Sequence, residues 1–357
     1  MKKIFIAALA ITALAACNKT EVVGVTESNA IAFDNAFVDN ATKSVNDPSF
    51  TNDNLFTDFA VYGFVEGAVL FDGTQVTGSA INGEWSYTDT QYWIAGANYN
   101  FAAVAPMTSG NWTKKTSTVD MTDGSSKYTV TTNLSFVNNG ATDLLYADAG
   151  KILGLASGNA KVAFTFRHVL SKVKFSFENA YNASAATIKV YDVKITNAYQ
   201  KGNVALTSAS TAWSDQAQTL VLDFGAAVNE GVDDADADGV QINNTADAFA
   251  YNTTLESYNE LLLIPGAVAG GYNVTFKVDL LVSDQKIKTY EHTAKVNFAP
   301  APGTCYDIKA VVNAENIDPE QEQEAIQFTV TEINGWADPA DGDDEGTYPD
   351  QPEADIQ

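Results

Sequence analysis

The chain contains few of the residues that most often carry catalysis or bind metals. Among its 357 residues are two histidines, His168 and His292, two cysteines, Cys17 and Cys305, and a single arginine, Arg167. Histidine is the commonest acid–base group and metal ligand near neutral pH, and arginine is the residue best suited to bidentate binding of phosphate. Their scarcity argues against acid–base catalysis, against phosphate recognition and against a histidine-rich metal site.

Positive charge and long apolar segments are also scarce. The net charge of −25 disfavours binding to nucleic acid and electrostatic docking on anionic lipid. Beyond residue 17 the apolar runs are short, and Leu261–Ile264, for example, stops at Pro265, so none can span a bilayer as a helix. Apolar residues still make up 45% of the chain, which is enough to build a core and excludes wholesale disorder.

The first sixteen residues have the features of a secretory signal. Two lysines precede an apolar run, Ile4–Ala16, which is too short to cross a bilayer and ends in small residues. Cys17 follows directly, an order typical of a bacterial lipobox, although a plain secretory signal that ends near a cysteine is the alternative. We therefore predict a signal peptide at 1–16, a lipidated Cys17 and a polar tether over 17–28. Cys305 then has no partner for an intrachain disulfide.

The rest of the chain is patterned as short β-strands. Alternation of apolar and polar residues, typical of half-buried strands, recurs through the body, and no long segment has helical periodicity. Between residues 59 and 106 the strand-like runs are brief, among them 68–71, 75–76 and 92–94. Many short strands at this spacing indicate an antiparallel β-sandwich, so the predicted fold class is all-β.

The length of the chain allows two domains, and a glycine-rich stretch suggests where they meet. Gly150, Gly154 and Gly158 mark a boundary that is uncertain by roughly ten to fifteen residues. We predict an N-terminal β-sandwich at 29–158 and a C-terminal β-sandwich in tandem at 159–336. The last residues, 337–357, are rich in Asp, Glu, Gly and Pro, which predicts an acidic disordered tail.

The clearest strand pattern follows residue 160. Val162, Phe164, Phe166 and His168 share one face, which places His168 toward the core, and the apolar row then resumes with the opposite parity at Val173. One extra residue in a strand reverses which side chains point inward. The pattern therefore predicts one long strand with a β-bulge or sharp bend at residues 171–172.

One acidic stretch has the spacing of a calcium-binding loop. Asp234, Asp236, Asp238 and Gly239 match positions 1, 3, 5 and 6 of such a loop. Position 12 is Thr245, where a bidentate carboxylate is needed. A solvated acidic loop is therefore the favoured interpretation. We predict no cofactor, with a structural calcium as the second possibility.

Two further groupings have weak functional interpretations. Cys305 could pair with His168 or His292 as nucleophile and base, but no catalytic motif surrounds it, so we expect no enzymatic activity. A set of aromatic residues could instead form a platform for sugars, although aromatic residues in strands more often pack in cores. This set leaves a surface glycan-binding lipoprotein as an alternative function, and its members are Trp85, Tyr87, Tyr92, Trp93 and Tyr99.

Several motifs follow one another along nearly the whole mature chain. They are Cys17 after the signal, Ile31-Ala-Phe33, Tyr99-Asn-Phe-Ala-Ala-Val-Ala-Pro106, Asp143-Leu-Leu-Tyr-Ala147, Phe164-Thr-Phe-Arg-His-Val-Leu-Ser-Lys-Val173 and Leu261-Leu-Leu-Ile-Pro265. In this order they resemble the fimbrillin family of Bacteroidales, the subunits of protease-assembled type V pili. The resemblance implies two transthyretin-like β-sandwich domains, export as a lipoprotein of the outer membrane, and polymerisation by strand exchange into a cell-surface fimbria (fimbrium, pilus) that contributes to cell adhesion.

The resemblance also assigns a role to the first strand. Ile31, Phe33 and Phe37 alternate with small or polar residues and form the candidate exchanged strand, which an extracellular protease would remove. Family members are usually cut after arginine, whereas the loop after this strand offers only Lys43, which is the candidate cleavage site. Without a cut, the protein would remain lipid-anchored as a pilus base subunit or a stand-alone surface protein.

The candidate donor strand lies near the C-terminus. Ile326, Phe328 and Val330 have the alternation needed to fill a groove that the lost first strand leaves in another subunit. The implied partners are other fimbrial subunits through strand exchange, the outer membrane through lipid, and a ligand on a host or bacterial surface.

Overall fold

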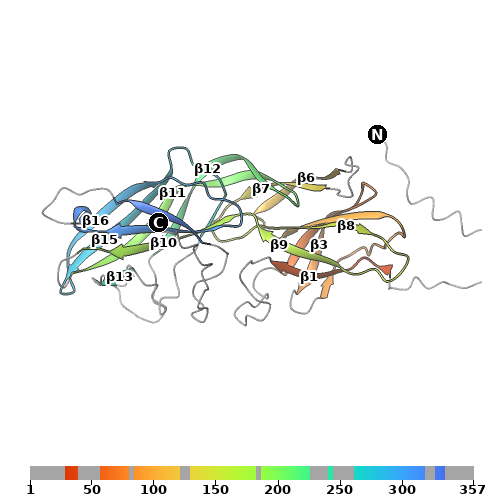
Figure 1. Ribbon diagram of the computed structural model, residues 1–357, viewed down its shortest axis with the longest axis horizontal. Coiled ribbons are helices and arrows are strands. Elements are labelled where there is room, and N and C mark those ends of the chain that lie inside the picture. Colours follow the sequence, from red (N-terminus) through yellow and green to blue (C-terminus); the bar gives the residue numbers. More distant parts are fainter. Residues whose placement is uncertain are drawn as a thin grey trace, which may run out of the picture.

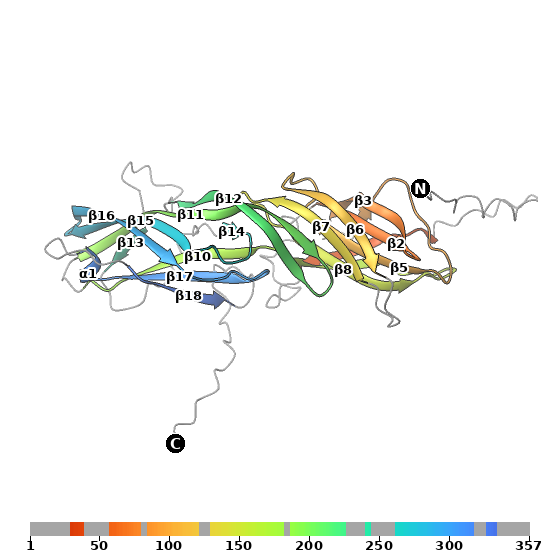
Figure 2. The same ribbon diagram turned by 90° about the horizontal axis from the view of Figure 1, so that it is seen from above.

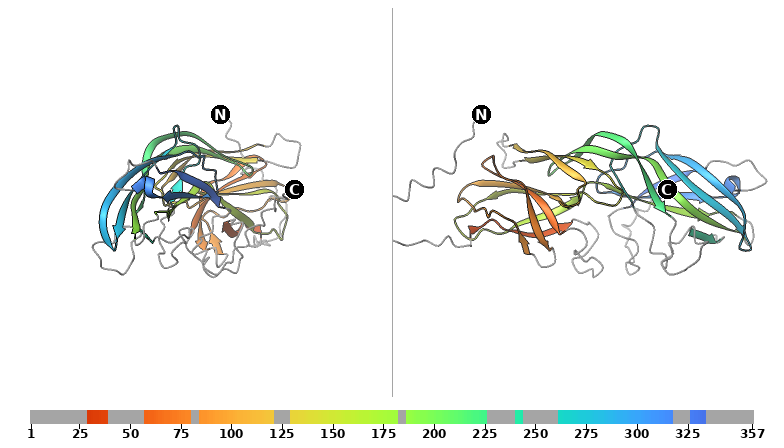
Figure 3. Two further views of the ribbon diagram at one scale, coloured as in Figure 1. Left: turned by 60° about the vertical axis from the view of Figure 1, so that its left-hand side comes forward. Right: turned by 180° about the vertical axis from the view of Figure 1, so that it is seen from behind.

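A computed structural model describes residues 29–38, 57–79, 84–120, 129–181, 186–225, 240–243, 261–317 and 326–333. Over these residues the chain is almost entirely β, and the one helix is the short α1 (Ala314–Ile317). No helix in this part of the chain is long and apolar enough to cross a membrane. Three sheets form an elongated body with the N-terminal strands at one end and the C-terminal strands at the other (Figures 1 and 3). The all-β sandwich prediction is confirmed.

The N-terminal sheet curls until its two edges approach each other. Its strand order is β1 (Phe33–Val38), β9 (Val162–His168), β8 (Leu145–Leu153), β5 (Asn98–Ala105), β2 (Asp58–Val65), β3 (Ala68–Ser79) and β4 (Glu84–Ser86). Ala30, just before β1, pairs with Tyr92, which follows β4. The sheet therefore surrounds a buried cluster, here called the first core, that includes Phe59, Phe101 and Phe164.

The long sheet extends along the molecule and is built on β11 (Ala186–Leu206). Its order is β16 (Gln285–Val296), β15 (Tyr272–Val282), β11, β7 (Thr129–Val137) and β6 (Trp112–Asp120), while β12 (Thr211–Gly225) and β13 (Val240–Asn243) also pair with β11. Residues 186–195 of β11 pair with β15, and residues 201–206 pair with β7. As a result, β6 and β7 lie beside the N-terminal strands, and β15 and β16 lie toward the opposite end (Figure 2).

The C-terminal sheet packs on the long sheet. Its order is β14 (Leu261–Leu263), β10 (Ser171–Asn179), β17 (Cys305–Val312) and β18 (Phe328–Ile333). The second core between these sheets includes Phe175, Phe276 and Ile308. A middle core, which includes Tyr62 and Leu134, forms where the other face of the N-terminal sheet packs on β7 and β11.

The chain passes from the N-terminal to the C-terminal sheet at Val169 and Leu170, both of which are buried. Because β9 pairs with β1 and β8, the change of sheet falls after His168. The predicted bulge at residues 171–172 of one long strand is wrong. The parity change instead separates two strands in different sheets, which need not keep one phase across their connection.

Three predicted runs also differ from the structure. Residues 68–71 and 75–76 belong to the single strand β3, whose irregular pairing with β2 includes Gly73 at a positive φ of 81°. Residues 92–94 form no strand and contribute only the isolated pairing of Tyr92. By contrast, residues 272–282, in which apolar and polar side chains alternate regularly, form the single strand β15, and His168 is buried as expected.

Candidate functional site

The first core is closed by the segment 29–38, which lies at the edge of the N-terminal sheet. On one side β1 pairs in parallel with β9, with Phe33 opposite Val162. On the other side, the backbone N–H of Ile31 donates to the carbonyl of Gln91 at 2.8 Å, and the N–H of Trp93 donates to the carbonyl of Asn29 at 3.0 Å. The segment therefore fills the gap between the two edges of the curled sheet.

Phe33 anchors this segment in the first core. Its ring lies 5.5–6.2 Å, centroid to centroid, from the rings of Phe59, Phe71, Tyr87, Phe101 and Phe164. Both Ile31 and Phe33 are only 1% exposed. Because apolar burial stabilises in proportion to the area removed from water, these two side chains hold the segment more strongly than its few backbone contacts do.

The outer half of β1 is paired less regularly. The register with β9 shifts between Asp34 and Ala36, which is a bulge at Asn35. Beyond it the backbone of Phe37 pairs with Thr165, and the Phe37 side chain lies outside the described part of the structure. The described anchors of the segment are therefore Ile31 and Phe33.

The candidate donor strand, β18, forms one edge of the C-terminal sheet. β18 pairs antiparallel with β17 over six residue pairs, including Phe328 with Ala310 and Val330 with Ile308. Ile326 is buried, whereas Phe328 and Val330 are half-buried against the second core. The Phe328 ring lies 5.7–6.5 Å from three other rings, those of Phe175, Phe177 and Phe276. The candidate donor thus covers apolar surface in its own half of the molecule.

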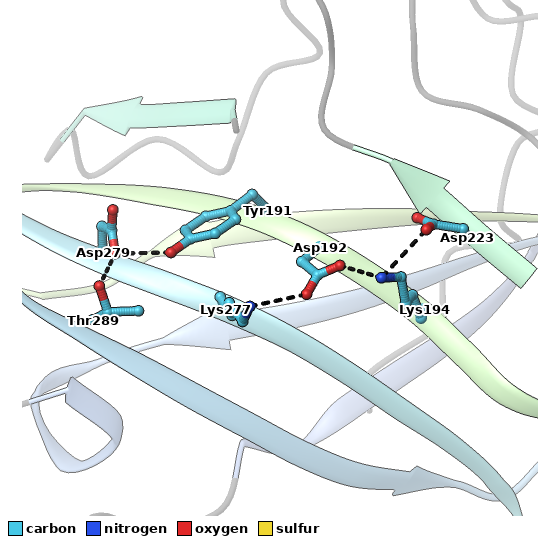
Figure 4. Close-up of polar contacts among 7 residues, drawn as sticks. All are labelled: Tyr191, Asp192, Lys194, Asp223, Lys277, Asp279 and Thr289. Atoms are coloured by element: carbon cyan, nitrogen blue, oxygen red, sulfur yellow. Dashed lines mark hydrogen bonds and ion pairs between the residues drawn. The ribbon is translucent and has the colours of Figure 1, made fainter. Parts of the chain in front are cut away.

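A polar network crosses the outer face of the long sheet where β11 is bulged (Figure 4). The register of β11 with β15 shifts between Tyr191 and Lys194, and Asp192 has a positive φ of 56°. Lys194 contacts Asp192 and lies 3.3 Å from Asp223, and Lys277 lies 3.2 Å from Asp192. The hydrogen bond from Lys194, followed by that from Lys277, lowers the pKa of Asp192.

Beside this bulge a second carboxylate is also fully engaged. Asp279 accepts hydrogen bonds from the hydroxyls of Tyr191 at 3.2 Å and Thr289 at 2.5 Å, and Lys286 lies 3.4 Å from it (Figure 4). Each carboxylate here faces a lysine, so the cluster fixes the bulged strands instead of holding a cation. In the residues that the structure describes, no group of three or more His, Cys, Asp or Glu could hold a metal ion.

The residues considered for catalysis have structural surroundings. His168 pairs through Nδ1 with Asp143. His292 stacks on Phe276 with centroids 5.0 Å apart, and burial lowers the pKa of His292 to about 4. Cys305 is buried at the start of β17.

The aromatic platform is contradicted by burial. Trp85, Trp93 and Tyr99 belong to the first core and are at most 8% exposed. Tyr87 packs against that core and donates its hydroxyl to the carbonyl of Ile31 at 2.7 Å. Tyr92 alone of the five is exposed. These residues support the closing segment instead of presenting a flat surface to a sugar.

Several predicted sites lie outside the described residues. These are the lipidation site Cys17, the cleavage site Lys43 and the calcium candidates Asp234, Asp236 and Asp238. They remain predictions.

Sequence reasoning missed two features that organise the site. Gln91 and Trp93 meet the first segment through backbone atoms, which leave no signal in side-chain patterns. The guanidinium of Arg167 on β9 donates to Thr211 Oγ1 at 2.7 Å and to the carbonyls of Thr207 and Ser210 at 2.6 and 3.0 Å. The only arginine of the chain thereby fastens β9 to the turn between β11 and β12, and its rarity was the one available hint.

These features define an all-β sandwich protein whose N-terminal sheet is closed by an edge segment. Residues 1–18 match a prokaryotic membrane lipoprotein lipid attachment site, so the protein is a membrane-anchored surface lipoprotein. Residues 41–336 match the fimbrillin-like family, and the chain belongs to that family. The family is one of structural fimbrial proteins and is not a class of enzymes. No curated protein matches the chain.

A solved structure shares the fold. A fimbrial protein from Bacteroides vulgatus is 16% identical, with a TM-score of 0.54 over 87% of this chain and 100% of its own. A proposed cell adhesion protein from Bacteroides uniformis is 15% identical, with a TM-score of 0.46 over 86% of this chain and 97% of its own. At such identities the first likeness supports the fold alone.

Proposed function

We propose that the protein is a structural, non-enzymatic subunit of a cell-surface fimbria that contributes to adhesion. In this proposal it is exported as a lipoprotein to the outer membrane and assembles by strand exchange after proteolysis removes the segment that contains β1. The observation that carries the proposal is the position of 29–38, an edge segment that closes the first core with two buried side chains.

The energetics of this closure favour replacement over an empty groove. Burial of Ile31 and Phe33 contributes about 3–6 kcal/mol before ordering costs. Loss of the segment would expose the rings around Phe33 and the free edge of β9, which together form a template for an added strand. A strand from a second copy restores both kinds of contact.

The donor in this proposal is β18 of the next subunit. Ile326 and Phe328 have the same two-residue spacing as Ile31 and Phe33, so they can occupy the same two positions in the first core. β18 is an edge strand, and Phe328 and Val330 are only half-buried in their own subunit. Both features lower the free energy needed to detach β18 from that subunit. The family match also begins after β1 and extends past β18.

Limited digestion of the full mature chain with a lysine-specific protease tests the proposal. Lys43 is the only basic residue between β1 and β2. Cleavage there, verified by a new N-terminus at Ser44, should convert monomer into a ladder of detergent-resistant oligomers. The Lys43→Gln variant, digested in parallel, should remain monomeric.

A second variant separates cutting from assembly. Phe328→Asp should be cut at Lys43 as readily as the original chain and should not form the ladder, because a charged side chain cannot enter the first core. If the cut original chain stays monomeric at high concentration, the stalk role by strand exchange is wrong.

The segment between β1 and β2 offers a protease only a lysine, Lys43, and no arginine. This favours a second candidate function, a base subunit that is never cut and keeps its lipid anchor. Intact mass of the protein released from cells distinguishes the two. A lipidated mass that starts at Cys17 supports the base subunit, whereas a mass that starts at Ser44 supports the stalk.

A further inference from the structure

Four large apolar side chains are exposed together at the outer end of the N-terminal sheet. Tyr92, Ile94, Leu153 and Leu155 are 47%, 54%, 54% and 48% exposed, and we call them the end patch. The two segments that carry them are joined by backbone hydrogen bonds between Gly96 and Gly154 at 2.8 Å and between Gly154 and Ala97 at 2.9 Å. The two segments therefore lie side by side, and each carries two of the four exposed side chains. Clustered exposed apolar residues mark interaction sites more often than scattered ones do.

The end patch is held rigidly. The N–H of Ile94 donates to the hydroxyl of Tyr99 at 2.7 Å, and Tyr99 is itself buried in the first core. Gly154 lies so close to the other segment that a Cβ there would be 2.4 Å from the carbonyl oxygen of Ile94. These apolar side chains are thus displayed by a fixed scaffold and could not be buried by a small local rearrangement.

The surroundings of the end patch differ in charge from the rest of the molecule. The chain has a net charge of −25, yet residues 90–105 contain no charged side chain and residues 149–161 contain only two lysines. These are Lys151 and Lys161, both exposed, and Lys161 lies 3.8 Å from Asp34. The other acidic groups nearby are Glu66, which accepts from the N–H of Asn98, and Asp89. The described segments that carry the end patch are therefore apolar, with little negative charge.

The end patch also adjoins the point where the described chain begins. Asn29 donates through Nδ2 to the carbonyl of Trp93 at 3.0 Å and accepts from Nδ2 of Asn159 at 2.8 Å. Cys17 belongs to the matched lipid attachment site, and only residues 18–28 separate it from Asn29. A chain of that length spans at most about 40 Å when fully extended, so the end patch must stay close to the membrane that holds the anchor.

We propose that the end patch rests on the lipid surface to which Cys17 anchors the uncut protein. A short tether gives the patch a high effective concentration at the bilayer, so a few apolar side chains suffice for contact. Tyrosine beside aliphatic residues also suits the boundary between headgroups and acyl chains. The proposal depends on lipidation of Cys17 and is independent of strand exchange.

Fluorescent labelling of the lipidated protein tests this contact. Ile94→Cys is labelled with an environment-sensitive probe in vesicles of phosphatidylethanolamine and phosphatidylglycerol that contain doxyl-labelled lipid. Ile287→Cys is the matched control, because Ile287 is 53% exposed and lies on β16 at the other end of the molecule (Figure 1). The thiol of Cys17 carries lipid in this protein, and the original sequence supplies the background from the buried Cys305.

The expected result is that lipid quenches the probe at position 94 severalfold more than the probe at 287. Equal quenching at the two positions would overturn the proposal. The proposal would also be overturned if the probe at position 94 became shielded from solvent as protein density rises, with no dependence on doxyl lipid. That result would identify a second copy of the protein as the partner of the end patch. Ile94→Ser should still form the oligomer ladder after cleavage at Lys43, so failure of this contact and failure of strand exchange are distinguishable.

Discussion

The first and second cores are each closed by an edge strand, and the two strands are held in different ways. β1 has an irregular parallel register with β9 but carries Phe33, which is 1% exposed and surrounded by five rings. β18 has a regular antiparallel ladder with β17, but Phe328 is only half-buried and lies near three rings. Side chains therefore dominate the attachment of β1, and backbone pairing dominates that of β18.

This difference suits the two roles proposed for the strands. The groove left by β1 would recognise a strand mainly through buried sites for its apolar side chains. Backbone hydrogen bonding is the same for all sequences, so any strand with the matching apolar spacing could bind there. A strand held chiefly by a backbone ladder can form an equivalent ladder elsewhere.

Truncation of the anchor in each strand should affect stability unequally. Phe33→Ala should lower the free energy of unfolding by about 3–5 kcal/mol, because it leaves a cavity among five rings. Phe328→Ala should cost about 1–2 kcal/mol, because its ring is half-buried. Urea denaturation measures both values, and hydrogen exchange should locate the first loss in β2, β5 and β9. Equal losses would contradict the contrast between the strands.

The first core should also tolerate no added volume beside Phe33. A Cβ at Gly63 would lie 2.6 Å from the Phe71 ring and 3.0 Å from the Phe101 ring. Gly63→Ala should therefore lower the free energy of unfolding by about 1–3 kcal/mol through overpacking. Ala163→Val on the exposed side of β9 is the control, and thermal unfolding should show little change for it. A stable Gly63→Ala variant would mean that the first core has unused space.

The stability of the second core should decrease at acidic pH because of the buried His292. Burial lowers the pKa of His292 to about 4, below its ordinary value near 6.5 in the unfolded chain. The unfolded state thus binds a proton first as pH falls, so the free energy of unfolding should decrease by about 1–2 kcal/mol between pH 6.5 and 4. His292→Phe should remove that part of the pH dependence, measured by thermal unfolding across this range. Identical pH profiles for the two proteins would contradict the assignment.

The sequence predicted those parts of the fold that depend on local alternation. The rows at 272–282 and, from Phe328 onward, 326–330 form strands because one face of each meets a core, and such a pattern is visible without knowledge of its partner. The parity change after His168 was ambiguous, because a bulge within one strand and a change from one sheet to another both reverse the apolar–polar alternation of the sequence. Only the three-dimensional pairing decides between them.

The candidate site shows the same division between local and distant information. Ile31 and Phe33 were identified from their alternation, and both are buried. Their closing partners, Gln91 and Trp93, lie some sixty residues away and bind through backbone atoms, so no side-chain pattern could reveal them. The aromatic residues near position 90 were equally visible in the sequence, but only the curl of the sheet showed that most of them face inward.

The continuity of β11 has a mechanical consequence. This strand of 21 residues pairs with β15 at one end and with β7 at the other, so the two halves of the molecule share one hydrogen-bonded sheet. Each molecule should therefore behave as a stiff rod with no internal hinge between its halves. A filament built from such rods would flex at the joints between molecules, and its bending stiffness would be set by the strand that crosses each joint.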